Sequence, residues 1–279
     1  MAGTTLSWCA QEVRRHDPDR FLVSLFLPAE RREAVFALTA FNNELVRAQE
    51  AASEPMLGAI RLQWWREGVA GIAAGEVRAH PVLAALAAPV RSGDIVPSAL
   101  LELVDARECD LDDSPIRDLA ALQHYAASTG GRLATVMATM IGVDDDAGRS
   151  IAGDAGTAYA LAGLMTSIPA FAGQDRILLP ADRLAAHGIR AADVKAGMSG
   201  RKLAPVVADI ARLIVDHRRR IRSGARLLPP RARGILLFGT LAGIHLARLL
   251  RVGGDPWRLP PRQAPPALRL WVAAITGRY

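Results

Sequence analysis

The sequence predicts a single all-α domain, and three observations favour it: the composition, the spacing of the apolar residues and the absence of internal division. Hydrophobic residues make up 51% and charged residues 22% of the 279 residues, which excludes intrinsic disorder as the main state. Ala, Leu and Arg are abundant while aromatics are only 5%, and unbranched side chains lose little rotamer freedom in a helix. No repeat or low-complexity linker divides residues 1–279, so we expect one domain of about eight to eleven helices.

Apolar residues at helical spacing place the elements in order along the chain. The first clear helix is expected just after Pro28, because a proline at that position loses no helical hydrogen bond. A second helix is expected to begin near Glu54 and Pro55 and to end at Gly75. The apolar stripes of these two helices are Ala34, Val35, Leu38, Phe41 and Leu45, and Leu62, Trp65, Val69 and Ile72. Further helices are expected over 97–108, 115–140, 147–167, 202–222, 231–250 and 266–276, with strand character only near 176–179.

The stretch from Gly234 to Leu250 is apolar almost all round, which predicts a helix buried inside the bundle. His245 lies on this stretch and is expected to be a buried neutral imidazole. No apolar run of about 18 residues lacks a charge or a proline, so no membrane-spanning helix is expected.

Several classes of function lack the residues that they require. The two cysteines, Cys9 and Cys109, form no CxxC pair and no cluster with histidine, which excludes a disulfide scaffold, a zinc finger and an iron–sulfur protein. The GxGxxG, Walker and GxSxG motifs are absent, which argues against nucleotide binding and serine-hydrolase chemistry. Residues 1–17 lack the regions of a secretory signal, so a cytoplasmic, reduced protein is expected.

Two runs of aspartate are the candidate metal ligands that the residues offer. Asp110, Asp112 and Asp113 precede a Ser-Pro pair, and the second run is 144–146. Both runs stand between expected helices, where Asp and Ser commonly form turns and cap helices. We therefore expect caps rather than metal ligands at both places, and no metal or other cofactor.

Trp64 is the candidate contact residue for a partner protein. Trp65 belongs to the apolar stripe of its helix, while Trp64 points about 100° away from it at α-helical geometry. Packing inside the molecule is the favoured interpretation of Trp64, and contact with a partner protein is the alternative.

Four motifs in order resemble the squalene/phytoene synthase family. They are the segment 20–42, the RLQWWREGV stretch that begins at Arg61, the YAASTGGRLA stretch that begins at Tyr125, and an LPxDxLxxxG pattern over 179–188. Each motif is weak alone, but their order and intervals cover nearly the whole chain. The resemblance implies the isoprenoid synthase fold, a helical bundle with a central cavity.

The sequence departs from that family where the resemblance implies metal binding. Family enzymes join two prenyl diphosphates and hold Mg²⁺ against the diphosphates with two aspartate-rich helical motifs. The first motif, DDxxD, should fall on 46–50, and the second should lie within 165–175, where this chain has a proline inside the expected helix. Residues 19–21 also read DRF where the family has Ser-Phe-Tyr. The residues at the two degenerate motifs are Val46, Arg47 and Glu50 in the first, and Ser167 and Asp175 in the second.

These losses predict that the chain does not condense prenyl diphosphates. Ionising a diphosphate needs divalent cations to neutralise the leaving group, and Mg²⁺ needs several oxygen ligands in near-octahedral order. Glu50 and Asp175 cannot supply two opposed carboxylate clusters, and Arg47 places a positive charge where a metal would lie. No catalytic residue is assigned, and Mg²⁺ is expected only if the protein is an active enzyme.

The pattern of loss resembles one branch of the family, the non-catalytic proteins similar to the mitochondrial respiratory complex I assembly factor. Residues 40–45 read AFNNEL and residues 53–65 read SEPMLGAIRLQWW, as in that branch. The resemblance implies an assembly or accessory role at a membrane respiratory complex. Two alternatives remain open: a prenyltransferase acting on farnesyl or geranylgeranyl diphosphate, and a protein that binds an isoprenoid or lipid in the cavity.

The charge is unevenly distributed along the chain. Residues 201–279 carry 16 basic and 3 acidic residues, whereas residues 1–200 carry 18 basic and 25 acidic ones. This favours an anionic partner for the C-terminal third. The candidate surface is Arg218, Arg219, Arg220 and Arg222, which predicts weak, salt-sensitive attachment to the inner membrane from the cytoplasm. Pairing with the acidic part of the chain is the alternative, and no nucleic-acid partner is expected because no reading motif accompanies the charge.

Overall fold

Helices are the only regular structure in the residues that the computed structural model describes, which are 6–50, 55–111, 115–197, 200–261 and 266–279. The all-α prediction is confirmed. The α-helices are α1 (Trp8–His16), α2 (Pro18–Ser24), α3 (Arg32–Glu50), α4 (Pro55–Ala74), α5 (Pro81–Arg91), α6 (Pro97–Asp105), α7 (Leu119–Ala126), α8 (Arg132–Met140), α9 (Asp146–Thr166), α10 (Ile168–Gly173), α11 (Ala181–Ala186), α12 (Ala191–Lys195), α13 (Ala204–Gly224), α14 (Leu237–Arg251) and α15 (Ala267–Thr276). Shorter helical turns are η1 (Ala29–Arg31), η2 (Glu108–Leu111), η4 (Arg201–Leu203), η5 (Ala225–Leu227), η6 (Pro230–Leu236) and η7 (Pro256–Arg258), and η3 (Ala127–Gly131) is a π-helix.

The described part of the chain holds fifteen α-helices, more than the eight to eleven expected. The additional ones are mostly short helices such as α1, α2 and α10 to α12, which span too few turns to show a clear apolar period. The strand character expected at 176–179 is wrong, because these residues form an irregular connection between α10 and α11.

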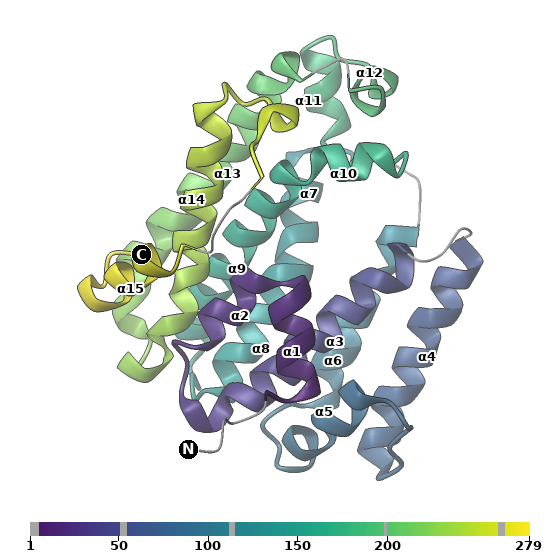
Figure 1. The fold of residues 1–279 in the computed structure, drawn as a ribbon, viewed down its shortest axis with the longest axis vertical. Helices are drawn as coiled ribbons and strands as arrows, with labels where there is room; N and C mark the ends of the chain where they lie inside the picture. The colour runs from purple at the N-terminus through teal and green to yellow at the C-terminus, as the bar shows by residue number, and fades with distance from the viewer. Residues whose placement is uncertain (1–5, 51–54, 112–114, 198–199, 262–265) are drawn as a thin grey trace.

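The N-terminal helices and the later helices form two halves of the bundle (Figure 1). Helices α1 to α6 occupy the lower right of that view, while α13 and α14 run along its left side. Helix α9 lies between them and packs against η3, α8, α13 and α14. Two clusters of buried apolar side chains form the core, and both α9 and α14 contribute side chains to each cluster.

The backbones of α9 and of the α7–η3–α8 segment approach each other closely where they cross, because both carry glycines there. A β-carbon on Gly156 would lie 2.2 Å from the carbonyl oxygen of Gly130, and one on Gly131 would lie 2.4 Å from the hydroxyl of Thr157. No other residue fits such a backbone approach. The crossing fixes α7 and its π-helical continuation beside α9, and so forms one wall of the cavity described below.

Helix α14 is largely buried, as its all-round apolar pattern predicts. The stretch Pro230–Arg251 is long and apolar enough to cross a membrane by length and composition, with a mean hydropathy of 1.3 over its apolar window. However, 56% of the apolar window lies buried inside the bundle. It packs against α9 and α13, which is the position of a core helix.

Candidate functional site

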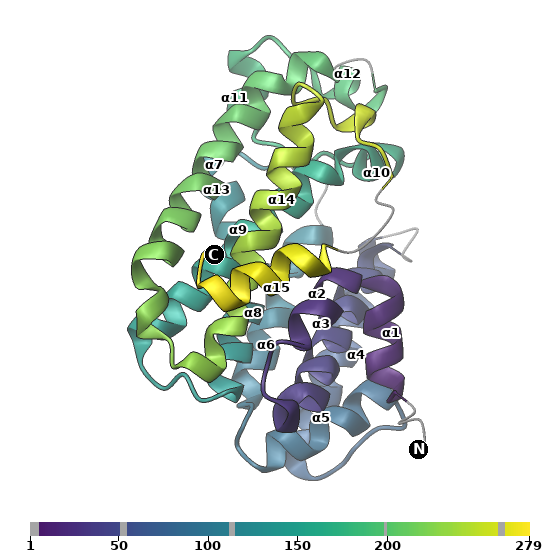
Figure 2. The ribbon, with the colours of Figure 1, turned by 60° about the vertical axis from the view of Figure 1, so that its left-hand side comes forward.

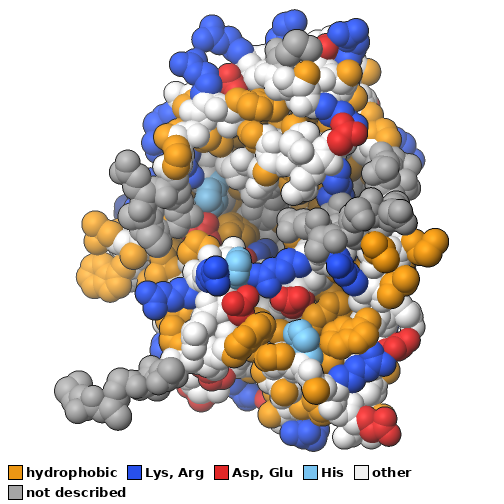
Figure 3. Space-filling view, turned by 45° about the vertical axis from the view of Figure 1, so that its right-hand side comes forward, with side chains coloured by type: hydrophobic (Ala, Val, Ile, Leu, Met, Phe, Trp, Pro, Cys, Tyr) orange, Lys and Arg blue, Asp and Glu red, His pale blue; other side chains and the backbone are white. Residues whose placement is uncertain are grey.

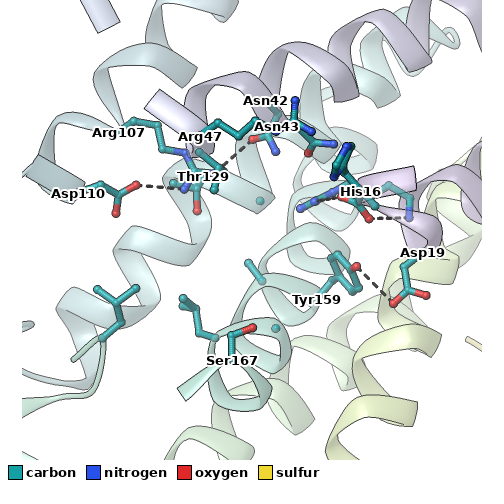
Figure 4. Close-up of a pocket in the computed structure, with 18 of the residues that line it drawn as sticks. His16, Asp19, Asn42, Asn43, Arg47, Arg107, Asp110, Thr129, Tyr159 and Ser167 are labelled. Atoms are coloured by element: carbon teal, nitrogen blue, oxygen red, sulfur yellow. Dashed lines mark hydrogen bonds and ion pairs between the residues drawn. The ribbon is translucent and has the colours of Figure 1, made fainter. Parts of the chain in front are cut away.

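A cavity of about 510 Å³, here called the central cavity, lies between α3 and α9 (Figure 4). The end of α1, α2, η2, α7, η3, α10 and the connection after α10 form the rest of its wall. Its polar lining residues are His16, Asp17, Asp19, Arg20, Asn42, Asn43, Arg47, Arg107, Asp110, Tyr125, Thr129, Tyr159, Ser167 and Arg176. Basic, acidic and histidine side chains gather in the middle of the corresponding face of the molecule (Figure 3).

Helix α3 presents amide, apolar and basic side chains to the central cavity: Asn42, Asn43, Val46 and Arg47. Arg47 donates to Glu44 Oε1 at 2.7 Å and to Glu12 Oε2 at 3.3 Å, so its guanidinium is held by two carboxylates. The two sequence-predicted positions Val46 and Arg47 therefore line the cavity. Glu50 ends the same helix, but its side chain lies outside the described part of the structure.

Helix α9 faces α3 across the central cavity with Tyr159, Ala160, Gly163, Leu164 and Ser167 at its end. The proline in this segment interrupts the helix, because α9 ends at Thr166 and α10 starts at Ile168, just before Pro169.

The two residues assigned to the degenerate second motif are separated by this break. Ser167 lines the central cavity, but Asp175 is not part of its lining. The Asp175 carboxylate is 83% exposed and pairs with Lys195 Nζ at 3.0 Å. The structure therefore places Asp175 on the outside of the molecule.

Asp110 is the centre of a buried hydrogen-bond network in the cavity wall. The Tyr125 hydroxyl donates to Asp110 Oδ1 at 2.8 Å, and Arg107 Nη1 donates to Asp110 Oδ2 at 3.3 Å. Arg176 Nη2 donates to the Asp110 carbonyl at 3.1 Å, and Arg107 Nη2 donates to Asn42 Oδ1 at 3.3 Å. Burial raises the pKa of the Tyr125 hydroxyl; Arg107 opposes this effect, and Asp110 adds to it.

Asp110 lies in the helical turn η2, as expected of a turn residue, but the expected cap role is wrong, because its side chain is buried and accepts from Tyr125 and Arg107 instead. Asp112 and Asp113 lie outside the described residues. In the second aspartate run the expectation is confirmed at Asp145, whose side chain caps α9 by accepting from the Gly148 N–H at 2.6 Å.

A second charged network joins α2 to α9 and α14 at the cavity. Arg20 pairs with Asp17 and lies over the ring of Tyr159, with its Cζ 5.1 Å from the ring centroid. Asp19 Oδ2 lies 2.8 Å from His245 Nε2 and 3.4 Å from the Tyr159 hydroxyl. Burial alone would lower the pKa of Arg20, but Asp17, Tyr159 and Asp19 outweigh it and raise that pKa. His245 is thus half-buried and paired with a carboxylate, a partner that its apolar helix did not reveal.

The donor set of the central cavity does not fit a pair of Mg²⁺ clusters. Among the described residues, neither α3 nor α9 contributes a carboxylate to the lining. The carboxylates that do line it, Asp17, Asp19 and Asp110, each contact a cationic or imidazole side chain. Arginine offers N–H donors to an anion and no lone pair to a metal. The arrangement suits binding of an anionic group better than coordination of Mg²⁺.

Trp64 packs against other side chains of this chain, which leaves less of its ring for contact with a partner protein. It is half-buried, and its ring centroid lies 4.9 Å from that of Trp65 and 5.5 Å from that of His80. The Arg78 guanidinium covers it at 5.5 Å from the centroid. These contacts agree with the favoured interpretation, in which Trp64 packs inside the molecule.

The four arginines predicted as a membrane surface lie on α13, and three of them are exposed. Arg219 pairs with Asp216 at 2.8 Å, Arg220 donates to Asp154 at 2.9 Å, and Arg222 Nε donates to the Tyr279 carbonyl at 3.0 Å. Arg218 is half-buried, and burial followed by the nearby Arg222 lowers its pKa. Pairing with the acidic part of the chain, the alternative interpretation, therefore holds for Arg220.

The sequence alone does not identify Arg107, Tyr159 and Arg176 as cavity residues, nor the contact of the cavity residue Asp19 with His245 of α14. Tyr125 begins one of the four family motifs, and the DRF at 19–21 departs from the family pattern. That departure was the available signal, because Asp19 and Arg20 both line the cavity.

Comparisons of the sequence and of the fold relate this chain to known proteins. The family model for squalene/phytoene synthase matches residues 13–271. The chain is 31% identical over 254 residues to NADH dehydrogenase (ubiquinone) complex I, assembly factor 6, of Bos taurus, which covers 91% of this chain and 76% of that protein. It is 27% identical over 191 residues to phytoene synthase of Thermus thermophilus, with 66% and 62% covered. The crystal structure of squalene synthase HpnC from Alicyclobacillus acidocaldarius matches with a TM-score of 0.77 at 22% identity, covering 89% of this chain and 94% of that one.

Proposed function

The chain belongs to the squalene/phytoene synthase family, and we propose that within it this protein is a non-catalytic assembly or accessory factor for a membrane respiratory complex of the complex I type. The relative at 31% identity is named as a complex I assembly factor, and it is similar over 91% of this chain. We propose the same role for this chain because the side chains that line its cavity are not those needed to bind Mg²⁺ and convert prenyl diphosphates.

One observation carries the proposal: the two facing helices of the central cavity present no carboxylate from their described side chains. Helix α3 offers Asn42, Asn43 and Arg47, and α9 offers Tyr159 and Ser167. Opposed carboxylates are needed to bring Mg²⁺ against a diphosphate from both sides. Arg47 is itself occupied by Glu44 and Glu12, so its charge is already balanced within the protein.

Co-purification from native membranes tests the assembly role. The tagged full-length protein, expressed at its native level, should recover subunits or assembly intermediates of an NADH dehydrogenase complex. Deleting the gene should reduce the fully assembled complex on native gels, and the Arg47→Ala variant should restore it as well as the wild type. Normal complex levels in the deletion strain would contradict the assembly role.

A direct assay separates this proposal from the enzymatic alternative. The purified protein is incubated with farnesyl or geranylgeranyl diphosphate and Mg²⁺ or Mn²⁺, and diphosphate release and hydrocarbon products are measured. We expect neither above background. Formation of squalene, phytoene or a presqualene-type intermediate at enzymatic rates would establish a prenyltransferase instead.

Binding of an anionic isoprenoid or lipid without turnover is a second candidate function. Its support is the central cavity itself, where Arg20, Arg107 and Arg176 line about 510 Å³. Equilibrium binding of farnesyl diphosphate in the presence of EDTA tests it, with the Arg107→Gln variant expected to bind more weakly. Equal binding by that variant would rule the cavity out as the site.

We also propose that the protein works on the cytoplasmic side of the inner membrane as a peripheral protein. The support is the excess of 16 basic over 3 acidic residues in 201–279 and the exposure of Arg219, Arg220 and Arg222 on α13. Because Arg219 and Arg220 are paired within the protein, their contribution to lipid binding should be smaller than that of unpaired arginines.

A further inference from the structure

Helix α15 exposes apolar side chains on the face that it turns away from the bundle. It packs against α14 through Leu270 and Ala273, which are buried. Its four large apolar side chains besides Leu270 are exposed to solvent: Leu268 is 73%, Trp271 57%, Val272 46% and Ile275 64% exposed. Spacings of three and four residues put these four side chains on one continuous face. An exposed apolar face with a tryptophan at its centre marks an interaction site more often than a chance surface.

The position of α15 in the fold makes this face accessible. Figure 2 shows α15 lying across α14, with its C-terminal end toward α13. In Figure 3, hydrophobic side chains gather at the left edge of the molecule, where α15 lies. The helix is ten residues long, so it is about 15 Å from end to end.

Exposed arginines lie next to this face in the sequence. Arg269 lies on α15 itself and Arg278 just after it, and both are exposed. Arg222 of α13 is brought to the end of the chain by its hydrogen bond to the Tyr279 carbonyl. No acidic residue lies between Pro256 and Tyr279, so α15 and the residues on either side of it carry only positive charge.

The small size of the apolar face and the positive charge beside it together favour a lipid surface over a second copy of the chain as its partner. One face of a helix about 15 Å long covers only a few hundred Å², whereas a stable protein interface buries about 1,200 Å² or more. A two-fold contact through α15 would also place the arginines of one copy against those of the other. An anionic bilayer instead offers hydrocarbon to the apolar face and phosphate groups to the arginines, and tryptophan prefers the boundary between them.

We propose that α15 is the element that docks the protein on an anionic membrane, with its exposed apolar face in the interfacial layer and the neighbouring arginines on lipid phosphates. This inference deepens the proposed function and depends on it only for the membrane setting. Docking through α15 leaves the core helix α14 inside the bundle.

Vesicle binding with tryptophan as the reporter tests the docking. Vesicles of phosphatidylcholine alone are compared with vesicles that contain about one third phosphatidylglycerol, and brominated lipids are used as quenchers. We expect quenching and a blue shift only with the anionic vesicles, and loss of both in Trp271→Phe. The four remaining tryptophans then serve as the internal control, since they lie on other elements.

Matched variants assign the binding to this face. The Leu268→Ser/Ile275→Ser double variant should weaken partition to anionic vesicles at least about tenfold, because two exposed apolar side chains are lost from the interfacial layer. The Met56→Ser/Ile60→Ser variant removes similarly exposed apolar side chains from α4 and should bind as the wild type does. Arg269→Ser and Arg278→Ser should each weaken binding about fivefold at low salt. Circular dichroism should show unchanged melting for all these surface variants.

Three outcomes would overturn the inference: equal binding to neutral and anionic vesicles, no effect of the α15 variants, or dimers in sedimentation velocity that the Leu268→Ser/Ile275→Ser variant dissolves. The first excludes an anionic membrane as the occupant, the second excludes α15 as the docking element, and the third assigns its exposed face to a second copy. None of these outcomes depends on whether the protein co-purifies with the respiratory complex. The failure of this inference and the failure of the proposed function can therefore be told apart.

Discussion

Arginine side chains in the wall of the central cavity are held by carboxylates, most of them three positions away in the sequence. Arg47 is held by Glu44 and Glu12, and Arg107 by Asp110. A guanidinium keeps its charge at any physiological pH and presents its donors in a fixed plane. The positive charge in the cavity wall is therefore fixed, and the guanidinium groups that carry it cannot act as metal ligands.

Restoring the first motif alone should not create an enzyme. The Val46→Asp/Arg47→Asp/Glu50→Asp variant would supply carboxylates on α3, but α9 would still face them with Ala160, Leu164 and Ser167. One cluster cannot hold metals on both sides of a diphosphate. We expect no product from farnesyl or geranylgeranyl diphosphate with Mg²⁺, measured by chromatography of the organic extract. Detectable squalene or phytoene would show that the α9 side suffices as it is.

Asp154 should stabilise the fold in a pH-dependent way. It accepts from Arg220 and lies 2.6 Å from His217 Nδ1, which links α9 to α13. Burial would raise its pKa, but the hydrogen bonds from His217 and Arg220 outweigh burial and lower that pKa. A carboxyl with a lowered folded-state pKa contributes stability above its unfolded pKa of about 3.9 and loses it as the pH falls through the folded value.

The Asp154→Asn variant should therefore lower the free energy of unfolding by about 1 to 3 kcal/mol at pH 7. The difference from the wild type should shrink as the pH falls below about 4. Urea denaturation followed by circular dichroism measures both. Asp216→Asn, which breaks an exposed pair on α13, is the matched control and should cost at most about 1 kcal/mol. Equal losses in the two variants would show that the Asp154 contacts add nothing to stability.

At the scale of elements, α9 organises the bundle because small residues let other helices approach it closely. It contacts η3, α8, α13 and α14. Gly130, Gly131 and Gly156 meet at the crossing with η3, where the π-helical turn carries Thr129 into the cavity wall. A π-helical turn within a helix often accompanies a functional site.

Two glycines of the same helix should respond oppositely to alanine. In Gly156→Ala the new β-carbon meets backbone at 2.2 Å, so α9 must move away from η3 and the cost should be about 1 to 3 kcal/mol or more. At Gly163 nothing lies within 4 Å, so alanine should stabilise α9 by up to about 1 kcal/mol. Thermal melts of the two variants and the wild type give the signs directly. A Gly156→Ala protein as stable as Gly163→Ala would mean that the crossing is looser than described.

At the scale of the whole molecule, two apolar clusters are joined by helices that belong to both. Ala152 and Ala155 of α9 lie in the first cluster, and Leu161 and Met165 of the same helix lie in the second. Helix α14 is divided in the same way. Neither cluster can lose its packing without exposing apolar side chains of the other.

Residues 1–279 should therefore unfold in one cooperative transition, as expected of a single domain. Scanning calorimetry should give one peak whose calorimetric and van't Hoff enthalpies agree. The Gly156→Ala variant should shift this peak without splitting it. Two separate transitions would show that the two halves are independent domains.

The sequence by itself determined the helical class, the apolar stripes and the break before Pro169, because each depends on residues within a few turns of one another. The buried faces of α3, α4 and α14 could be predicted for the same reason, since the spacing of apolar residues along a helix shows which face is buried. The resemblance also placed Val46, Arg47 and Ser167 at positions that line the cavity.

Only the tertiary structure decided which charged side chains meet. In the sequence Asp110 has only the pattern of a turn residue, but in the structure Arg176, 66 positions away, donates to its carbonyl oxygen. Asp19 likewise lies within hydrogen-bond distance of His245, which is 226 positions away. The same holds for α15, whose helical character was predicted but whose exposed face depends on how it lies on α14. Helical period is local information, whereas burial and ion pairing depend on the path of the whole chain, and no local pattern encodes that path.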